Sequence, residues 1–353
     1  MKISISTAVT RFLIFCFWIA AIASFLLLPA LVNKLRSQKS ITIFTWPMML
    51  DPIYLQKFER ETGIKLYITY FENGPSLLSK IEATRGAGYD LIIPDDHSLA
   101  QLIEKGLVKK IDKNQLKFWN NIRPELLGNY ADPENNYSIP YYWAMYGIGY
   151  DANQLKESPS DSWGSLFNPN IDGHGHICMT DDAREAVMMT ALYLFGSIDA
   201  LKDKANLQKV KETLIAQKKF VEVYSISRSD SLLQSKSCLL AMITNPELAR
   251  LSREHSQFKF IKPREGSMVV VDSMALSAGS DKDALVYEFL NYLYKDEVIR
   301  YHIENFGYCS PISTVSSDQE EICSAQTFKD LHFMKSVISD DEINQLWIEV
   351  LGA

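Results

Sequence analysis

The chain has 353 residues, 47% of them hydrophobic and 22% charged, a composition typical of globular proteins that excludes collagen-like and disordered classes. Its net charge is −7, and all five charged residues before residue 40 are basic, so the remainder contains 31 basic and 43 acidic residues. Such an acidic body argues against nucleic acid as the partner and is compatible with a cationic ligand. The length suggests two domains.

An apolar segment lies near the N-terminus, where residues 12–32 contain no charged side chain. About 20 apolar residues are needed to span a bilayer, whereas the apolar part of a cleaved signal is usually about 7–15 residues long. Residues 1–39 are therefore predicted to be a signal anchor that attaches the protein to the membrane. A long cleaved signal peptide is the alternative, because Ala21-Ile22-Ala23 has the small-x-small form of a cleavage site. We expect the body to lie outside the cytoplasm.

Strands and helices alternate along the rest of the chain. In chain order the prediction is strand 41–46, helix 52–62, strand 65–71, helix 76–84, strand 90–94, helix 98–105, strand 176–179, helix 182–195, helix 207–216, strand 220–224, strand 238–243, helix 245–253, strand 268–271 and helix 282–294. Residues 132–146, rich in Pro, Asn and Tyr, interrupt this alternation. The pattern predicts an α/β fold with a mostly parallel sheet, in two lobes that meet near residues 145 and 271.

Polar or aromatic side chains follow four of the predicted strands. They are Trp46, Asp95, Asp182 and Asp272. Ligands of open α/β sheets bind at the carboxyl ends of strands, and clefts between domains are favoured sites. These four residues are therefore candidates for a ligand site between the lobes.

Four cysteines lie outside the apolar segment, namely Cys178, Cys238, Cys309 and Cys323. Four cysteines allow three pairings, and the sequence does not choose among them. In an oxidising compartment, Cys178–Cys238 and Cys309–Cys323 are plausible disulfides; the alternative is four buried thiols. None of the four has the spacing of a metal site, so no metal or cofactor is predicted.

Several sequence blocks together resemble one protein family. They are Trp46 with Phe58-x-x-Glu61-Thr62-Gly63-Ile64, Tyr89-Asp90-Leu91-Ile92-Ile93-Pro94, Tyr137-Ser138-Ile139-Pro140-Tyr141-x-Trp143, Thr180-Asp181-Asp182-Ala183-Arg184-Glu185, and Val271-Asp272-Ser273-x-Ala275 with Phe306-Gly307-Tyr308. Their order and spacing over residues 40–312 resemble the spermidine/putrescine-binding receptors of bacterial ABC importers. The blocks at Thr180 and Tyr137 are the most specific.

The resemblance implies a two-lobed, type II-like solute-binding fold that closes about a hinge. One lobe would comprise residues 40–145 and 272–316, and the other residues 146–271 and 317–353. In the family, aromatic rings enclose a polyamine and carboxylates hold its ammonium groups. The residues that would do so here are Trp46, Asp95, His97, Asp182, Glu185, Asp272 and Tyr308. The implied protein is a periplasmic receptor, without enzymatic activity, that delivers its ligand to an inner-membrane permease; we expect it to be a monomer.

Each of these residues also has a purely structural interpretation. Asp182 and Glu185 have the spacing of a capping box at the start of a helix, and Asp95 is placed to cap the helix that follows it. Asp272 would then be a turn residue at the hinge, while Trp46 and Tyr308 would simply pack in the core.

The sequence departs from the family pattern at several positions of the aromatic site. Met49 replaces a tyrosine, Asp95 and His97 replace a serine and a tyrosine, and Thr244 and Val270 stand where the family has tryptophans. Each missing ring removes about 0.5–2 kcal/mol of cation–π attraction. The hypothesis is therefore a cationic ligand that is either not spermidine or is bound more weakly, with Asp95 as an additional carboxylate and His97 as a pH-sensitive group.

Three other functional classes remain as alternatives. An enzyme could use Asp182 with Glu185, or Asp95 with Asp272, as an acid/base pair, although the sequence contains no nucleophile motif or phosphate loop. An iron receptor could use Tyr141, Tyr142 and His97. A degenerate anchored receptor could serve as a sensing or interaction module.

Overall fold

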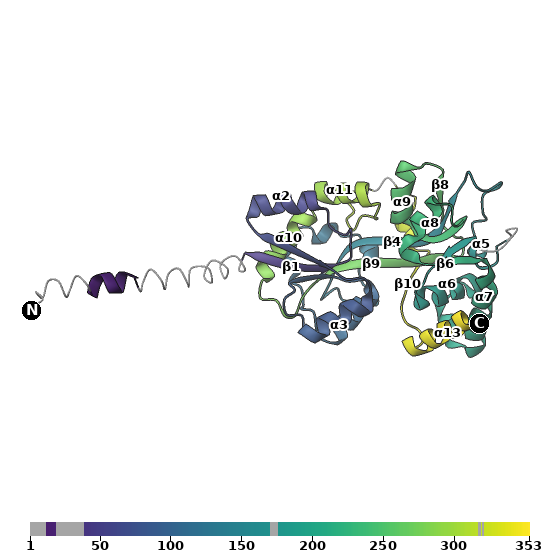
Figure 1. Cartoon of the computed structure of the whole chain (residues 1–353), viewed down its shortest axis with the longest axis horizontal. Coiled ribbons are helices and arrows are strands. Elements are labelled where there is room, and N and C mark those ends of the chain that lie inside the picture. Colours follow the sequence, from purple (N-terminus) through teal and green to yellow (C-terminus); the bar gives the residue numbers. More distant parts are fainter. Residues whose placement is uncertain (1–11, 19–38, 170–175, 317–318, 320) are drawn as a thin grey trace, which may run out of the picture.

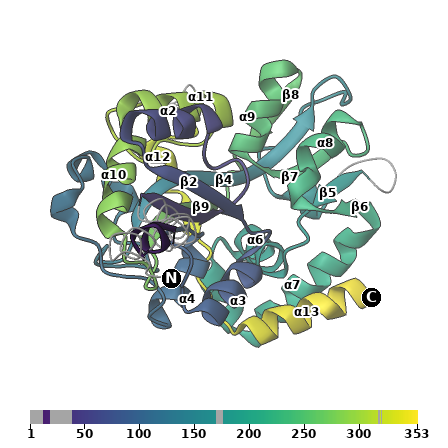
Figure 2. The same ribbon diagram turned by 60° about the vertical axis from the view of Figure 1, so that its left-hand side comes forward.

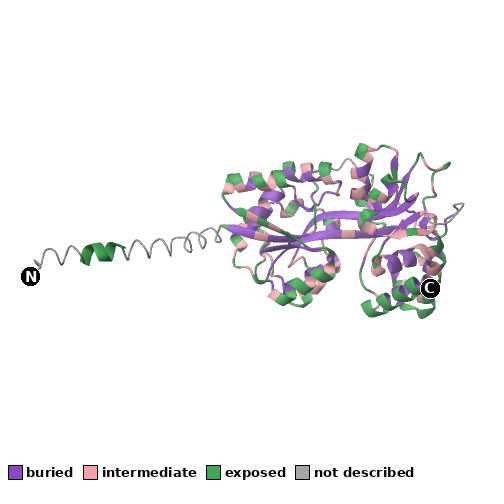
Figure 3. Cartoon of the chain, viewed as in Figure 1, coloured by how far each residue is buried: buried purple, intermediate pink, exposed green. Residues whose placement is uncertain are grey.

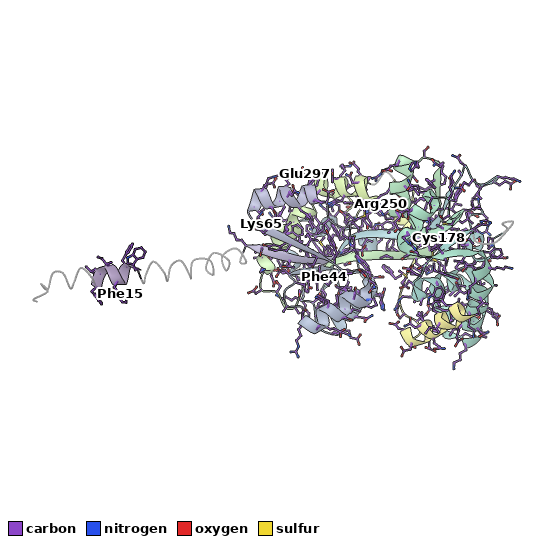
Figure 4. The ribbon with its side chains drawn as sticks, in the orientation of Figure 1. Phe15, Phe44, Lys65, Cys178, Arg250 and Glu297 are labelled. Atoms are coloured by element: carbon purple, nitrogen blue, oxygen red, sulfur yellow. A yellow bond between two sulfur atoms is a disulfide. The ribbon has the colours of Figure 1, made fainter. Side chains whose placement is uncertain are left out.

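The computed structural model describes residues 12–18, 39–169, 176–316, 319 and 321–353. Residues 12–18 are helical, with exposed side chains such as Phe15 (Figure 4). The rest of the predicted signal peptide or anchor lies outside the described residues. Within the described part of the chain, no helix combines the length and the apolar character needed to cross a membrane.

The elements alternate along the chain much as predicted. The strands are β1 (Ser40–Thr45), β2 (Lys65–Tyr70), β3 (Leu91–Ile93), β4 (Ile139–Asp151), β5 (Ile177–Met179), β6 (Val221–Tyr224), β7 (Leu240–Thr244), β8 (Phe258–Ile261), β9 (Ser267–Leu276) and β10 (Leu331–Phe333). The α-helices are α2 (Pro52–Thr62), α3 (Gly74–Thr84), α4 (Asp96–Glu104), α5 (Gly164–Phe167), α6 (Ala183–Phe195), α7 (Lys204–Gln217), α8 (Ser229–Gln234), α9 (Asn245–Glu254), α10 (Asp283–Leu293), α11 (Asp296–Phe306), α12 (Ala325–Phe328) and α13 (Asp340–Gly352).

Local sequence signals set the ends of α2, the helix whose bounds match the prediction. Asp51 caps its N-terminus by accepting a hydrogen bond from the Ile53 N–H, and Pro52 occupies the first turn, where a missing N–H costs nothing. Gly63 ends the helix with φ of 71°, a left-handed conformation that glycine adopts without strain. Phe58 is the fully buried residue of the helix and anchors it on the core.

The sheet joins two groups of elements through two long strands. Its order is β2-β1-β3-β9-β4-β7-β5-β6, with β10 beside β9 and β8 beside β4. Figure 1 shows α2, α3, α10 and β1 on one side and α5 to α9 with α13 on the other, while β4 and β9 run between them. Pairing is parallel within β2-β1-β3 and within β7-β5-β6, as predicted, but β9 pairs antiparallel with β3 and β4, and β4 with β7. The result is a two-lobed α/β fold.

The predicted interruption at residues 132–146 is wrong in its second half, because Ile139 begins the 13-residue strand β4. Every residue of β4 is buried, so the strand lacks the polar–apolar alternation that identifies a strand with one exposed face (Figure 3). Pro140 made the strand harder to predict, because proline is uncommon inside central strands. It lies where the pairing with β9 shifts register between Pro140 and Tyr142. Strand β9 is likewise longer than the predicted 268–271.

Strand β4 changes its antiparallel partner along its length. Its residues up to Met145 pair with β9, and those from Tyr146 pair with β7. The change at Met145 and Tyr146 lies at the lobe boundary that the sequence predicts near residue 145. The exact limits of the lobes, including the assignment of residues 317–353, stay a prediction; α13 packs against α6 and α7 (Figure 2).

Helices α9 and α11 provide a contact between the lobes on one side of the molecule. Arg250 and Arg253 of α9 donate hydrogen bonds to the carbonyl oxygens of Phe306 (3.0 Å) and Ile303 (3.2 Å), in the last turn of α11 (Figure 4). Cations stabilise the negative end of a helix in this way. Gly307 allows the close approach, since a Cβ there would meet the Pro246 carbonyl oxygen at 3.0 Å.

One of the two plausible disulfides is present. Cys309 and Cys323 are bonded, with Cα atoms 5.2 Å apart, whereas Cys178 and Cys238 are free and buried. The pairing of Cys178 with Cys238 considered from the sequence is therefore not found. Both thiols lie in an apolar cluster of the second lobe beside Leu233 and Ile243, where they pack as small hydrophobic side chains.

Candidate functional site

Trp46 directly follows β1, whereas Asp272 lies inside β9 and pairs with Tyr142 of β4, so the interpretation of Asp272 as a turn residue is wrong. Asp272 is only 9% exposed, and burial raises the pKa of its carboxyl well above the usual range, with the charges of Asp95 and Asp96 raising it further. The indole N–H of Trp46 lies near this carboxylate and lowers its pKa, but Nε1 forms no regular hydrogen bond within the described chain. The Trp46 ring packs edge-on against Phe71, with centroids 4.4 Å apart.

The start of α4 brings two adjacent carboxyl groups to the same region. Asp95 caps α4, accepting hydrogen bonds from the Ser98 N–H (2.7 Å) and the Ser98 hydroxyl (3.1 Å), so its capping role is real. The next residue, Asp96, is 1% exposed, and its Oδ2 has no hydrogen-bond partner among the described residues. Burial, and then the neighbouring charge of Asp95, raises the pKa of Asp96 to about 8.

Asp182 and Glu185 begin α6 in the second lobe. Asp182 caps the helix by accepting from the Glu185 N–H at 2.9 Å, but the predicted capping box is only half formed. The Asp182 N–H donates instead to the Thr180 hydroxyl, and the Glu185 carboxylate accepts from Tyr146 and Thr180 hydroxyls, both at 2.5 Å. Burial, then the charge of Asp182, raises the pKa of Glu185 to about 8.

His97 lies on α4 and faces the second lobe. Its Nε2 lies 2.7 Å from the Gln101 side-chain nitrogen and 3.9 Å from Oδ2 of Asp340, at the start of α13. Burial, followed by the positive charge of Arg184, lowers the pKa of His97, while Asp95, Asp340 and Asp182 oppose that shift. His97 is therefore within electrostatic range of candidate carboxylates from both lobes.

Tyr308 follows α11 and stacks on Tyr142 of β4, with ring centroids 5.1 Å apart and planes inclined by 11°. Burial raises the pKa of its hydroxyl, and the charge of Asp272 raises it further, which places the two side chains near each other. The packing interpretation of Tyr308 is thus correct for its ring, while its hydroxyl group is close to the candidate site.

The predicted residues form two groups that His97 links, one with Trp46, Asp95, Asp272 and Tyr308 and the other with Asp182 and Glu185. The charge of Asp95 acts on Asp272 in the first lobe, and the charge of Asp182 acts on Glu185 in the second. The charges of Asp95 and Asp182 both act on His97. Four of the seven predicted residues are acidic, and Asp96 adds a fifth carboxyl group. Burial raises the pKa of three of these carboxyl groups, those of Asp96, Glu185 and Asp272, and a concentration of carboxyl groups is suited to binding a cation.

Comparison with known proteins identifies the family. Residues 87–335 match the model of the bacterial extracellular solute-binding proteins. The chain belongs to this family. The spermidine/putrescine-binding periplasmic protein of Escherichia coli is 25% identical over 322 residues, covering 89% of this chain and 92% of that protein. The putrescine-binding periplasmic protein PotF of the same organism is 27% identical, covering 83% and 84%.

The fold of this solute-binding protein is also that of solved relatives. A spermidine/putrescine ABC transporter substrate-binding protein, PotD, from Streptococcus pneumoniae superposes with a TM-score of 0.78 and 22% identity, covering 89% of this chain and 99% of the other. The two-lobed architecture is therefore the one expected from the sequence blocks.

The positions where this solute-binding protein departs from the family pattern have structural roles. Met49 is 1% exposed and packs in the core of the first lobe. Thr244 caps α9 and shares a reciprocal capping box with Glu247. Val270 is half-buried beside the core of the second lobe. None of these three side chains supplies an aromatic ring to the candidate site.

Sequence reasoning missed several polar residues of this region, notably Asp96, Tyr130, Tyr146 and Arg184. The pair Asp95-Asp96 was a usable signal, because a second acid directly after a capping aspartate is not needed for the cap. Tyr146 carried no signal of its own, since its approach to Glu185 depends on where β4 passes α6.

The tyrosines of the iron alternative belong to the first-lobe core. Tyr141 and Tyr142 are fully buried, and the Tyr141 hydroxyl hydrogen-bonds Nδ1 of the buried His302 at 3.2 Å. Among the described residues there is no cluster of three or more His, Cys, Asp or Glu side chains able to hold a metal ion.

Proposed function

We propose that this protein is the substrate-binding component of a polyamine ABC importer, which captures a cationic amine between its lobes and delivers it to a permease. The observation that supports the proposal is that acidic residues of both predicted lobes, Asp95 and Asp182, act on His97, with Asp96 and Asp272 near Asp95, and Glu185 beside Asp182. The curated relatives named for spermidine and putrescine support the same ligand class.

The physical chemistry of the site favours a ligand with ammonium groups. Burying an ammonium group without acceptors is prohibitive, whereas each charge-assisted hydrogen bond contributes about 1.5–3 kcal/mol. A ring such as that of Trp46 adds about 0.5–2 kcal/mol through cation–π attraction. A few of each, less the cost of ordering the ligand, correspond to micromolar binding, about −8 kcal/mol.

Binding would shift the population toward a closed form. Trp46, Asp95 and Asp272 would hold the ligand from the first lobe and the β9 crossing, and Asp182 and Glu185 from the second. A ligand that contacts both lobes binds the closed arrangement better than the open one, which is the requirement for such a shift. The permease would then recognise the closed shape.

The location of the protein follows from the same proposal. The family is extracellular and the relatives named above are periplasmic. We place the body in the periplasm, as a monomer tethered to the inner membrane by the apolar N-terminal segment. The Cys309–Cys323 disulfide is compatible with an oxidising compartment.

The test is calorimetric titration of the full chain, in a mild detergent, with putrescine, cadaverine, spermidine and spermine. The proposal expects saturable binding of at least one amine in the micromolar range. Absence of binding across the panel by a folded protein would refute it and would favour the degenerate, anchored sensing module.

A further inference from the structure

Arg184 is a cation placed in the middle of the acidic region. It occupies the first turn of α6, between Asp182 and Glu185, and its side chain is 16% exposed. After burial, its charge is the second cause that lowers the pKa of His97, and it opposes the rise that burial causes in the pKa of Tyr130, a first-lobe residue beside Asp96. The guanidinium group is therefore close enough to both lobes to influence the candidate ligand site.

Two residues near the C-terminus hold this guanidinium group. Nη2 of Arg184 donates to Oδ1 of Asp340 at 2.9 Å, and Nη1 donates to the Ser336 hydroxyl. Asp340 is the first residue of α13, and its other oxygen, Oδ2, is the one that lies 3.9 Å from His97. The position of Arg184 is thus fixed by a segment far away in the sequence.

A guanidinium group released from Asp340 would have strong alternatives nearby. Arginine stays charged at every physiological pH and readily pairs with carboxylates. Asp182 and Glu185 belong to the same first turn of α6, and the charges of Asp182 and Arg184 both act on His97. An arginine bound there would occupy the acceptors that a ligand ammonium group needs.

We propose that Asp340 is a positioning residue that keeps Arg184 away from Asp182 and Glu185, so that these carboxylates stay free for a cationic ligand. This inference rests on the proposed function, because it assumes that the ligand is a cation. Arg184 is then an internal competitor of the ligand, and Asp340 suppresses the competition without touching the ligand itself.

The first test compares putrescine binding among four variants of the full chain by calorimetry. Asp340→Asn is expected to weaken binding about tenfold, the effect of about 1.4 kcal/mol of competition. Asp341→Asn is the matched control, because it removes an acid from the same turn of α13 with no ion pair among the described residues; its affinity should stay within about twofold of wild type. Arg184→Gln should bind at least as tightly as wild type.

The double variant Arg184→Gln with Asp340→Asn separates competition from simple structural damage. If Arg184 is the competitor, removing it restores the affinity that Asp340→Asn loses. Three results would overturn the proposal. Asp340→Asn could bind putrescine with wild-type affinity, the double variant could fail to recover the lost affinity, or Arg184→Gln could lose as much affinity as Asp340→Asn.

A second readout needs no ligand. In carbon-13 NMR titrations, the pKa of the Glu185 carboxyl should fall in Asp340→Asn, since a nearby guanidinium stabilises the carboxylate. It should be unchanged in Asp341→Asn and should not fall in the double variant. If the pKa of Glu185 is unaltered in Asp340→Asn, the inference about Asp340 is wrong, whether or not wild type binds an amine. If wild type binds no amine, the proposed function is refuted.

Discussion

The carboxyl groups of the site differ in how they are satisfied, and this difference sets their expected behaviour. Asp95 and Asp182 accept backbone hydrogen bonds as helix caps, while Glu185 accepts from two hydroxyls. Asp96 and Asp272 are the most deeply buried, and burial raises the pKa of both. Without a bound cation, several of these groups therefore retain protons near neutral pH.

The first prediction concerns the pH dependence of binding. The pKa values of Asp96 and Glu185 are each about 8, so both groups are largely protonated at pH 6. A cation favours the ionised carboxylates, and its binding must release these protons; affinity should therefore rise between pH 6 and pH 8. An alkylamine stays charged over this range, as lysine does. Calorimetry at several pH values checks this, and Glu185→Gln should show a shallower rise. A constant or falling affinity would contradict it.

For single residues, the sequence identified the candidates that follow predicted strands, but not the residues that reach the site only through tertiary contacts. Asp95, Asp182 and Asp272 could be found because each follows a predicted strand, although β9 continues past Asp272 to Leu276. Asp96 was hidden because a helix-starting acid is ordinarily exposed, and only the tertiary structure buries it. The half-formed capping box at Glu185 shows the same limit. The Glu185 carboxylate accepts a hydrogen bond from the Tyr146 hydroxyl of β4 and not from the Asp182 backbone N–H.

Elements with a clear period and clear end signals were predicted well, and those defined by tertiary contacts were not. Helix α2 has a cap, a first-turn proline and a terminal glycine, and its bounds match. Strand β4 is buried on both faces, so its sequence shows no alternation. Helices α11 and α13 were not predicted, although α13 supplies the aspartate that contacts Arg184 and His97.

The second prediction concerns the Cys309–Cys323 disulfide, which closes a segment with a sequence separation of 14 next to the end of α11. A loop of this length stabilises the folded state by about 3 kcal/mol through the entropy of the unfolded chain. Replacing both cysteines by serine should lower the free energy of unfolding in urea by about that amount. A matched change of the free pair, Cys178 and Cys238, to alanine serves as control, because its effect should be insensitive to reductant. If reductant leaves wild-type stability unchanged, the disulfide contributes nothing.

On the scale of the whole molecule, the two lobes are joined in different ways on different sides. Helices α9 and α11 are linked by arginines that cap a helix end, and β4 and β9 run through both lobes. Between α4 and α13, by contrast, His97 and Asp340 lie 3.9 Å apart, a separation longer than a hydrogen bond. We therefore expect the α4–α13 side to open and the α9–α11 side to act as the hinge.

The third prediction follows from this asymmetry. A saturating amine should reduce the radius of gyration measured by small-angle X-ray scattering, because closure brings α4 toward α13. Two spin labels, one at Glu104 on α4 and one at Glu349 on α13, should move closer on binding, while a pair at Glu254 on α9 and Glu304 on α11 should change little. Equal changes for the two pairs would contradict the hinge assignment.

The most direct test of the central claim compares wild type with Asp272→Asn in calorimetric titrations with putrescine. The substitution keeps the shape of the side chain but removes the carboxyl group that ionises when a cation binds, so binding should weaken about a hundredfold or more, as when one partner of a buried ion pair is lost. Asp341→Asn, which removes an acid that is not among the proposed amine contacts, should bind like wild type. Saturable binding in wild type that is lost in Asp272→Asn would support an amine receptor; equal binding by both proteins would contradict it.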